Sequence, residues 1–301
     1  MSAPQALYSQ FPPYFPEPWA SAWGEDRFGL WMTLIYQNAK QTFRWIEPGA
    51  FMMGSPETEL GRYDRETQHE VTLTQGYWLA DSACTQALWL AVTGDNPSRF
   101  KDDANNPVEQ ISWNDADKFI HQINQSVIGL DARLPTEAEW EYACRAGTAT
   151  PFSLGENMTP DQVNYDGNYP YAGGAKGLYR EKTVPVKSLP PNPWGLHEMH
   201  GNVWEWCQDR FAAFDAMPQT DPLGPETGAS RVLRGGSWLS NGRDVRSARR
   251  DRLEPGLRSF NFGFRLALGQ TGPGQSAARL LPGQPLAERR GGQGESSAAG
   301  I

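Results

Sequence analysis

The sequence predicts an α+β fold that is rich in loops, with small antiparallel sheets and two to three short helices. Its 301 residues include 12 Trp, 31 Gly and 24 Pro, a composition that favours irregular backbone. Apolar runs are short, and none approaches the roughly 18 residues that a membrane span needs. A few segments alternate with a period of two, and a few others carry helix-capping signals.

The chain begins with an arm that is rich in Pro and aromatic residues, and we expect residues 1–41 to pack irregularly on the domain. The segment 43–53 then predicts strand, turn and strand, with Pro48-Gly49 at the turn. Alternation at Val71, Leu73, Tyr77 and Leu79 predicts two further strands.

Three helices follow, each with its own boundary signals. The first is expected between Thr85 and Gly94, and the second after a cap at Ser112 or Asn114. The third has Thr136 as N-cap, with a glutamate three residues later that completes a capping box, and Gly147 just past its end.

Beyond residue 150 the chain is rich in Gly, Pro and Asn, broken by "NVWEW" and "RVLRGGSW". From residue 269 to 301 the composition shifts to Gly, Pro, Gln, Ser and Ala, which buries too little apolar area to offset its ordering entropy. The sequence therefore predicts one domain over residues 42–268, preceded by the arm and followed by a disordered tail.

The formal net charge of −8 and the pI near 5.1 argue against a nucleic-acid partner. The first residues lack the basic and apolar regions of a signal peptide, so we expect a cytoplasmic protein. The three cysteines, Cys84, Cys144 and Cys207, are widely spaced and odd in number. This pattern predicts three buried thiols rather than disulfides or a zinc site.

The segment "GLHEMHGNVWEW" gathers His197, His200 and Glu205. Its histidines are three residues apart between glycines, whereas a catalytic zinc helix needs His-Glu-x-x-His. Glu205 lies between two tryptophans, where a carboxylate is either held by hydrogen bonds or acts as an oxygen ligand for calcium. Both readings stay open at this point.

No arrangement for nucleophilic catalysis or phosphate binding is found: the chain has no G-x-S-x-G elbow, Walker loop or G-x-G-x-x-G fingerprint. The arginine-rich segment 243–258 has acidic residues between its arginines. We expect those arginines to bridge loop carbonyls and carboxylates, because a loop-rich domain leaves carbonyls without ladder partners.

Six segments together resemble the formylglycine-generating enzyme (sulfatase-modifying factor) family: "WIEPGAFMMGS", "NPVEQISWNDA", "RLPTEAEWEYACRAG", "NPWGLHEMHGNVWEWCQD", "RVLRGGSW" and "GFRLA". The resemblance covers roughly residues 42–268 and implies a C-type-lectin-like fold. It also implies structural calcium in some members, at positions that match Gly201, Val203, Glu205 and Asn164 here.

The oxidase members of this family hold copper(I) with two cysteines that follow the "GGSW" motif, and thiolates are the ligands that copper(I) prefers. This chain has "LSNGRDVRSARR" there, with Ser240 near the first position and no cysteine after Cys207. Formylglycine generation by that mechanism is therefore not expected. A branch that uses non-haem iron carries a preceding His-rich bundle, which has no counterpart in this sequence.

The same motifs resemble the variable proteins of diversity-generating retroelements. In that group, template AAC codons become NNC between "GGSW" and "GFR", and the diversified residues form a ligand-binding surface. The matching candidates here are all encodable by NNC. They are Leu239, Ser240, Asn241, Asp244, Arg249, Asp251, Leu253, Leu257, Ser259, Phe260, Asn261 and Phe262.

The leading hypothesis is a non-catalytic protein that binds a protein or peptide ligand through these twelve residues, with no required cofactor and no catalytic residue. The residues around them would form a rigid frame: Arg234, Gly235, Gly236, Trp238, Gly263, Phe264 and Arg265. The alternative is an oxygen-dependent oxidase of the formylglycine-generating type with altered ligands, for which His197, His200 and Cys207 are the nearby candidates. A third class is an accessory domain of a bacterial signalling or conflict system.

Overall fold

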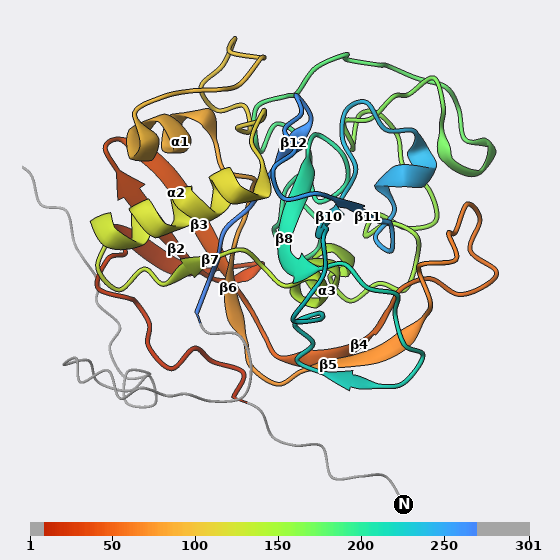
Figure 1. Ribbon diagram of the computed structural model, residues 1–301, viewed down its shortest axis with the longest axis horizontal. Helices are drawn as coiled ribbons and strands as arrows, with labels where there is room; N and C mark the ends of the chain where they lie inside the picture. Colours follow the sequence, from red (N-terminus) through yellow and green to blue (C-terminus); the bar gives the residue numbers. More distant parts are fainter. Residues whose placement is uncertain (1–8, 270–301) are drawn as a thin grey trace, which may run out of the picture.

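The computed structural model describes residues 9–269, which form three small sheets and three α-helices joined by long loops (Figure 1). The expected α+β, C-type-lectin-like class is confirmed. The expected tail lies outside the described residues, apart from Gly269.

The largest sheet has six strands in the order β1-β2-β3-β6-β13-β7, and every pair in it is antiparallel. Its strands are β1 (Ala22–Asp26), β2 (Gly29–Tyr36), β3 (Ala39–Ile46), β6 (Tyr77–Ala80), β7 (Ala132–Arg133) and β13 (Ala267–Leu268). Residues 22–36, expected as part of an irregular arm, are thus sheet strands, and the expected boundary at residue 41 falls inside β3. The turn at Gln37-Asn38, where both residues have positive φ, closes the β2–β3 hairpin.

The second sheet runs β11-β10-β8-β12 and the third runs β4-β5-β9. The second contains β8 (Trp204–Arg210), β10 (Arg231–Arg234), β11 (Arg250–Leu253) and β12 (Phe262–Gly263). The third contains β4 (Gly49–Met53), β5 (His69–Leu73) and β9 (Gln219–Thr220). The pairs β8–β12 and β5–β9 are parallel, so these sheets are not purely antiparallel as expected.

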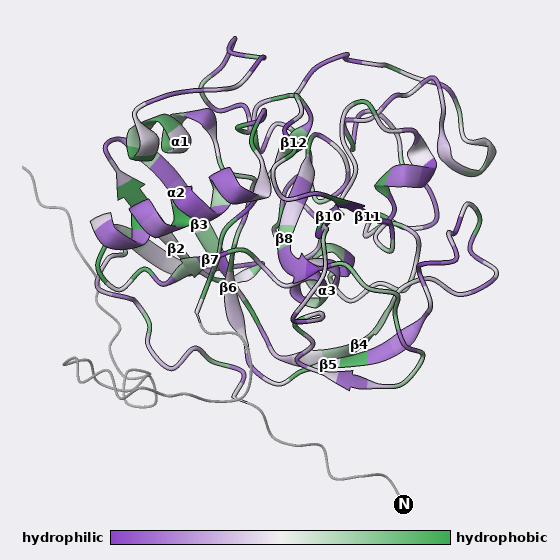
Figure 2. Ribbon diagram, viewed as in Figure 1, coloured by the Kyte–Doolittle hydropathy of each residue, from purple (hydrophilic) through white to green (hydrophobic). Residues whose placement is uncertain are grey.

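All three expected helices are confirmed: α1 (Gln86–Thr93), α2 (Trp113–Ser126) and α3 (Glu137–Arg145). Their N-caps are Thr85, Ser112 and Thr136, and the last two close capping boxes. Helix α2 buries only one face, which packs with α1 on the six-stranded sheet, and its ribbon is mainly hydrophilic (Figure 2). Helix α3 is buried almost all round, because it lies between β4 of the third sheet and β8 and β10 of the second.

Two large cores fill the space between these elements. One joins the six-stranded sheet to α1 and α2, and the other joins α3 to the smaller sheets. Between α3 and β8 the only regular element is a 3-10 helix at Tyr171–Gly173, and a second 3-10 helix spans Gly242–Val245. Residues 243–249 pair with no strand, so this loop depends on side-chain contacts.

Candidate functional site

Buried arginines support residues 235–266, the stretch of chain between β10 and β13. Arg234 on β10 is fully buried and forms an ion pair with Glu141 of α3. Its guanidinium also donates to three loop carbonyls, those of Ser247 at 2.8 Å, Ala248 at 3.1 Å and Arg249 at 2.9 Å. One side chain thus ties the loop to both a helix and a strand, as expected for arginine in a loop-rich fold.

Arg265 makes the corresponding link at the other end of the stretch. Its Nε and Nη2 donate to the two carboxylate oxygens of Glu205, at 2.6 and 2.7 Å. Its Nη1 donates to the carbonyl of Ala80 on β6 at 3.1 Å, so it joins the second sheet to the first. Both charges are buried, and such a pair is stable only because each group has several partners.

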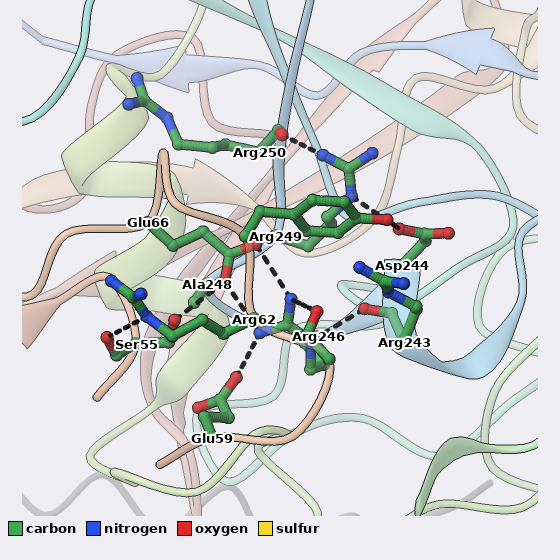
Figure 3. Close-up of polar contacts among 12 residues, drawn as sticks. Ser55, Glu59, Arg62, Glu66, Arg243, Asp244, Arg246, Ala248, Arg249 and Arg250 are labelled. Carbon is green, nitrogen blue, oxygen red and sulfur yellow. Dashed lines mark hydrogen bonds and ion pairs between the residues drawn. The ribbon is translucent and has the colours of Figure 1, made fainter. Parts of the chain in front are cut away.

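Two further arginines inside the stretch are also buried, so the whole loop is pinned. Arg246 lies between Glu59 and Glu66 and donates to both oxygens of Glu66 at 2.9 Å (Figure 3). Arg250 on β11 forms a two-bond pair with Glu137 at 2.7 and 2.6 Å. The expectation that arginines crosslink this region is confirmed for these residues.

The frame glycines are required by close approach. Gly235 and Gly236 have φ of +91° and +73°. A Cβ on Gly236 would lie 2.6 Å from the carbonyl oxygen of Asp244 and 2.5 Å from Val245 Cγ1. Since all seven frame residues are buried, the frame is rigid and its residues are not available for contact with a ligand.

Ten of the twelve candidate contact residues reach the surface. Leu239 and Leu257 are each 46% exposed, and eight others are half-buried. Arg249 and Asn261 are buried at 6% and 9%, so the expectation of surface exposure is wrong for these two. Arg249 is drawn inward by Asp244 at 2.8 Å (Figure 3) and by Asp251 at 3.0 Å. Asn261 donates to Ser237 Oγ at 3.1 Å.

Aromatic residues from other parts of the chain border this surface. Phe260 packs against Trp238 at a ring-centroid distance of 5.7 Å, and Phe100 and Tyr179 pack on Trp238 at 5.5 and 6.1 Å. The guanidinium of Arg99 lies 5.1 Å from the Phe260 ring centroid. These neighbours come from loops with no sequence period, so the pattern offered no signal for them.

A cavity of about 300 Å³ adjoins the other side of the stretch. It is lined by Asn241 and Arg243 together with Leu60 and Tyr169, which are each 63% exposed. The Arg243 guanidinium lies 4.1 Å from the ring centroid of Tyr63. The surface is therefore hollowed beside Asn241 and combines apolar groups with a cation.

The residues matched to calcium do not present one converging set of free oxygens. Both carboxylate oxygens of Glu205 already accept hydrogen bonds from Arg265, and Oε2 also accepts one from Trp140 Nε1 at 2.7 Å. Asn164 lies beside Gly201 through a backbone bridge, and its Oδ1 is buried with no hydrogen-bond partner. Asn164 Oδ1 is thus available to a cation. Glu205 is better described as the ion-pair partner of Arg265 than as a metal ligand.

The histidines near the stretch form hydrogen bonds with loop groups. His200 is buried, which lowers its pKa to about 4, and it lies 2.9 Å from Ser153 Oγ and within 3.9 Å of Cys144 Sγ. Burial also raises the pKa of Cys144 to about 12 and that of Cys207 well above its usual range. All three thiols are free and buried as expected, and residues 9–269 contain no cluster of three or more His, Cys, Asp or Glu that suits a metal ion.

Comparisons with known proteins show which family the chain resembles. The family model of the sulfatase-modifying factor enzyme 1-like domain matches residues 33–269. The formylglycine-generating enzyme of Streptomyces coelicolor is 39% identical over 203 residues, which cover 62% of this chain and 62% of that protein. The enzyme of the same name from Thermomonospora curvata is 35% identical over 231 residues, covering 70% of this chain and 74% of that protein.

Among solved structures, variable protein 1 of Treponema denticola superimposes with a TM-score of 0.68 at 28% identity. The match covers 79% of this chain and 98% of that one. The chain spans less than two thirds of the length of the Streptomyces coelicolor relative. Within residues 9–269, no helix has the length and apolar character to cross a membrane. From the six motifs, the fold and the matched range together, this chain belongs to the family of sulfatase-modifying factor enzyme 1-like domains.

Proposed function

We propose that the chain is a non-catalytic binding protein that presents residues 239–262 on a rigid lectin-like scaffold. The observation that carries the proposal is that the frame residues and the candidate contact residues differ in burial. The seven frame residues are all buried, whereas ten of the twelve residues between them reach the surface. A fixed scaffold with exposed loop side chains is the usual arrangement of a recognition surface.

The ligand is a protein or peptide. Leu239 and Leu257 expose apolar surface, Phe260 adds an aromatic ring, and Asp244 and Asp251 add charge nearby. Apolar and aromatic anchors among polar groups are typical of protein interfaces. The likeness to variable protein 1 of Treponema denticola supports a scaffold that carries a variable surface.

A library experiment tests whether this surface binds. The ten positions that are exposed or half-buried are randomised with NNC codons in a displayed form of the full chain, and the library is selected on hen lysozyme as a defined probe. We expect folded clones that bind the probe through the randomised residues, and a matched library over the seven frame positions should yield no folded clones. Failure of the first library to yield folded clones would contradict the proposal.

Diversification by a retroelement is a separate part of the proposal, and the DNA tests it. We expect a nearby template repeat with AAC codons at the twelve candidate positions, together with a reverse transcriptase gene. A genome that has neither removes the retroelement from the proposal and leaves the binding role to be judged by the library.

The second candidate function is an oxygen-dependent oxidase, which the 39% identity to the Streptomyces coelicolor enzyme favours. Against it, no cysteine follows Cys207, and Cys144 and Cys207 are buried thiols with raised pKa values. Incubation of the purified chain with copper(I), oxygen and a cysteine-containing peptide should leave the peptide mass unchanged. Appearance of the aldehyde product, or of one tightly held copper or iron per chain, would establish the oxidase instead.

Structural calcium and a cytoplasmic location stay predictions. For calcium, the orphaned Oδ1 of Asn164 supports a cation near Gly201, while the ion pair with Arg265 does not favour Glu205 as a ligand. The binding proposal requires neither, because the frame is held by buried ion pairs and by packing.

A further inference from the structure

A second cavity of about 300 Å³ lies apart from the proposed binding surface. It is enclosed by the third sheet, the first turn of α3, the end of β8 and the loop of residues 212–225. None of the twelve candidate contact residues lines it. In Figure 1 these elements meet in the lower part of the molecule, around α3, β4 and β5.

Asp209, near the end of β8, brings a carboxyl group to this cavity. Its side chain is 96% buried, since only 4% of the residue is exposed. Its Oδ2 accepts the backbone N–H of Glu137 at 2.8 Å, whereas Oδ1 forms no hydrogen bond with any residue in the described range 9–269. Burial and the neighbouring Glu137 carboxylate raise the pKa of Asp209 to about 8, so Oδ1 carries a proton at neutral pH.

The loop keeps the space over this oxygen open. Gly224 has a φ of +69°, and a Cβ there would lie 3.2 Å from Asp209 Oδ1 and 3.0 Å from the carbonyl oxygen of Arg210. A side chain at residue 224 would therefore cover the carboxyl group. With glycine, the group stays accessible from the cavity.

Of the other charged groups that line the cavity, Glu137 is paired with Arg250, and Arg210 adds a positive charge. Glu137 is neutralised by its two-bond pair with Arg250, whose guanidinium lies 3.6 Å from the ring centroid of Phe214. His69 places Nδ1 3.0 Å from the carbonyl oxygen of Thr67, which can only accept, so Nδ1 donates this hydrogen bond. Its Nε2 is buried without a hydrogen-bond partner.

Apolar side chains complete the walls. Met53 and Ala138 are buried beneath the cavity, and Phe214 and Leu223 belong to the loop over it. A volume of about 300 Å³ is at the lower end of the range for small-molecule sites. The cavity thus suits a compact ligand with an apolar body and one polar end.

We propose that the cavity at Asp209 binds a small uncharged molecule with an amide or carbonyl group on an apolar or aromatic body. The carbonyl oxygen accepts a hydrogen bond from Asp209, and the body packs against Phe214 and Met53. Arg250 is the one residue of the range 239–262 that lines this cavity, and it is not among the twelve candidate contact residues, so ligand binding here can be tested separately from that surface.

Ligand-observed fluorine NMR on the full chain tests the proposal with three probes of one shape: 4-fluorobenzamide, 4-fluorobenzoate and 4-fluorobenzamidine. At pH 7 we expect saturable binding of the neutral amide and at least tenfold weaker binding of the two ions. Gly224→Val should abolish amide binding because it covers Asp209. Gly94→Val is the matched control, since Gly94 also has a positive φ, +80°, and no atom lies within 4 Å of a Cβ at that position.

Asp209→Asn keeps a hydrogen-bond donor in the cavity and provides a second test in case Gly224→Val does not fold. The charged groups that act on Asp209 are Glu137 and Glu139 of α3 and Arg250 of β11. His69 of β5 and Arg210 also line the cavity. Amide binding to the unaltered chain should weaken above pH 8, as Asp209 ionises, and stay constant in Asp209→Asn. Tighter binding of the amidine than of the amide at pH 7, or amide binding that survives Gly224→Val, would overturn the proposal.

Discussion

At the scale of single residues, the stability of the stretch depends on arginines that water does not reach. Arg234, Arg246, Arg250 and Arg265 are each at most 1% exposed, and each is paired with a glutamate from another segment. Removing one partner from such a pair leaves a buried charge without compensation, which costs far more than losing a surface pair.

Glu205→Gln should lower the free energy of unfolding by about 3–5 kcal/mol, because Arg265 then keeps a buried charge without a carboxylate. Urea unfolding followed by tryptophan fluorescence measures the change. The exposed pair of Arg258 with Asp115 is the control, and Arg258→Ala should cost no more than about 1 kcal/mol. Equal costs for the two variants would contradict the role assigned to burial.

Asp209 should make the folded chain less stable as the pH rises. Its pKa is about 8 in the folded state, against an ordinary value of 3.8. Between pH 4 and 8 the folded chain therefore holds a proton that the unfolded chain has lost. The contribution of Asp209 to the unfolding free energy falls through this window and is constant above it.

In Asp209→Asn this fall should be missing, so the variant should exceed the unaltered chain in stability at pH 7 and match it most closely near pH 4. Thermal unfolding at several pH values gives the comparison. A variant with the same pH dependence as the unaltered chain would show that Asp209 titrates normally.

At the scale of elements, the caps and the alternation were sufficient to predict three helices and the strands β3 to β6. Thr136 and Glu139 identify α3 because a capping box is a local signal. Strands β1 and β2 were missed, because the Pro-rich segment before them suggested an irregular arm and their pairing depends on the β3 partner. The two-residue strands β12 and β13 have no sequence period at all.

Thr136→Ala should destabilise the chain by about 1 kcal/mol, since it leaves the N–H of Glu139 without its side-chain acceptor. The loss matters beyond α3, because Glu137 and Glu141 of this helix hold Arg250 and Arg234. Ser126→Ala, at the exposed end of α2, is the control and should change stability by less than about 0.5 kcal/mol. Calorimetry would measure both changes.

The loop itself should separate into tolerant and intolerant positions. The double variant Leu239→Ser with Leu257→Ser should melt within a few degrees of the unaltered chain, because each residue is already 46% exposed. Arg246→Met leaves Glu66 buried without its partner and should lower the melting temperature by about 5 °C or more. If the leucine pair proved as costly as the arginine, residues 239 and 257 would belong to the core.

At the scale of the whole molecule, the surface gathers residues that are far apart in the sequence. Motif spacing identified the stretch and its frame, but it did not identify Phe100, Tyr179 or Tyr63 as neighbours, since long loops bring them there. Nor did it indicate that Arg249 turns inward, because its partners Asp244 and Asp251 were assigned to the surface alongside it. The resemblance predicted where the surface lies, and tertiary packing determines which side chains are exposed on it.

Removal of divalent cations with EDTA should leave the melting temperature unchanged to within about 1 °C. Arg265 already supplies the positive charge that Glu205 requires. Differential scanning fluorimetry with and without added calcium provides the measurement. A rise of several degrees with calcium that Asn164→Ala abolishes would instead establish a cation at Asn164.

The place of β13 has a consequence for how errors in the gene are handled. Its two residues lie between β6 and β7 in the six-stranded sheet, and they follow the stretch in the chain. A reading-frame shift or premature stop anywhere between residues 239 and 262 therefore also removes Arg265 and the strand that joins β7 to the rest of the sheet. Such products cannot close the core and are left to proteolysis, so only messages with an intact reading frame yield a protein that persists. Folding thus acts as a proofreading step for whatever sequence the loop carries.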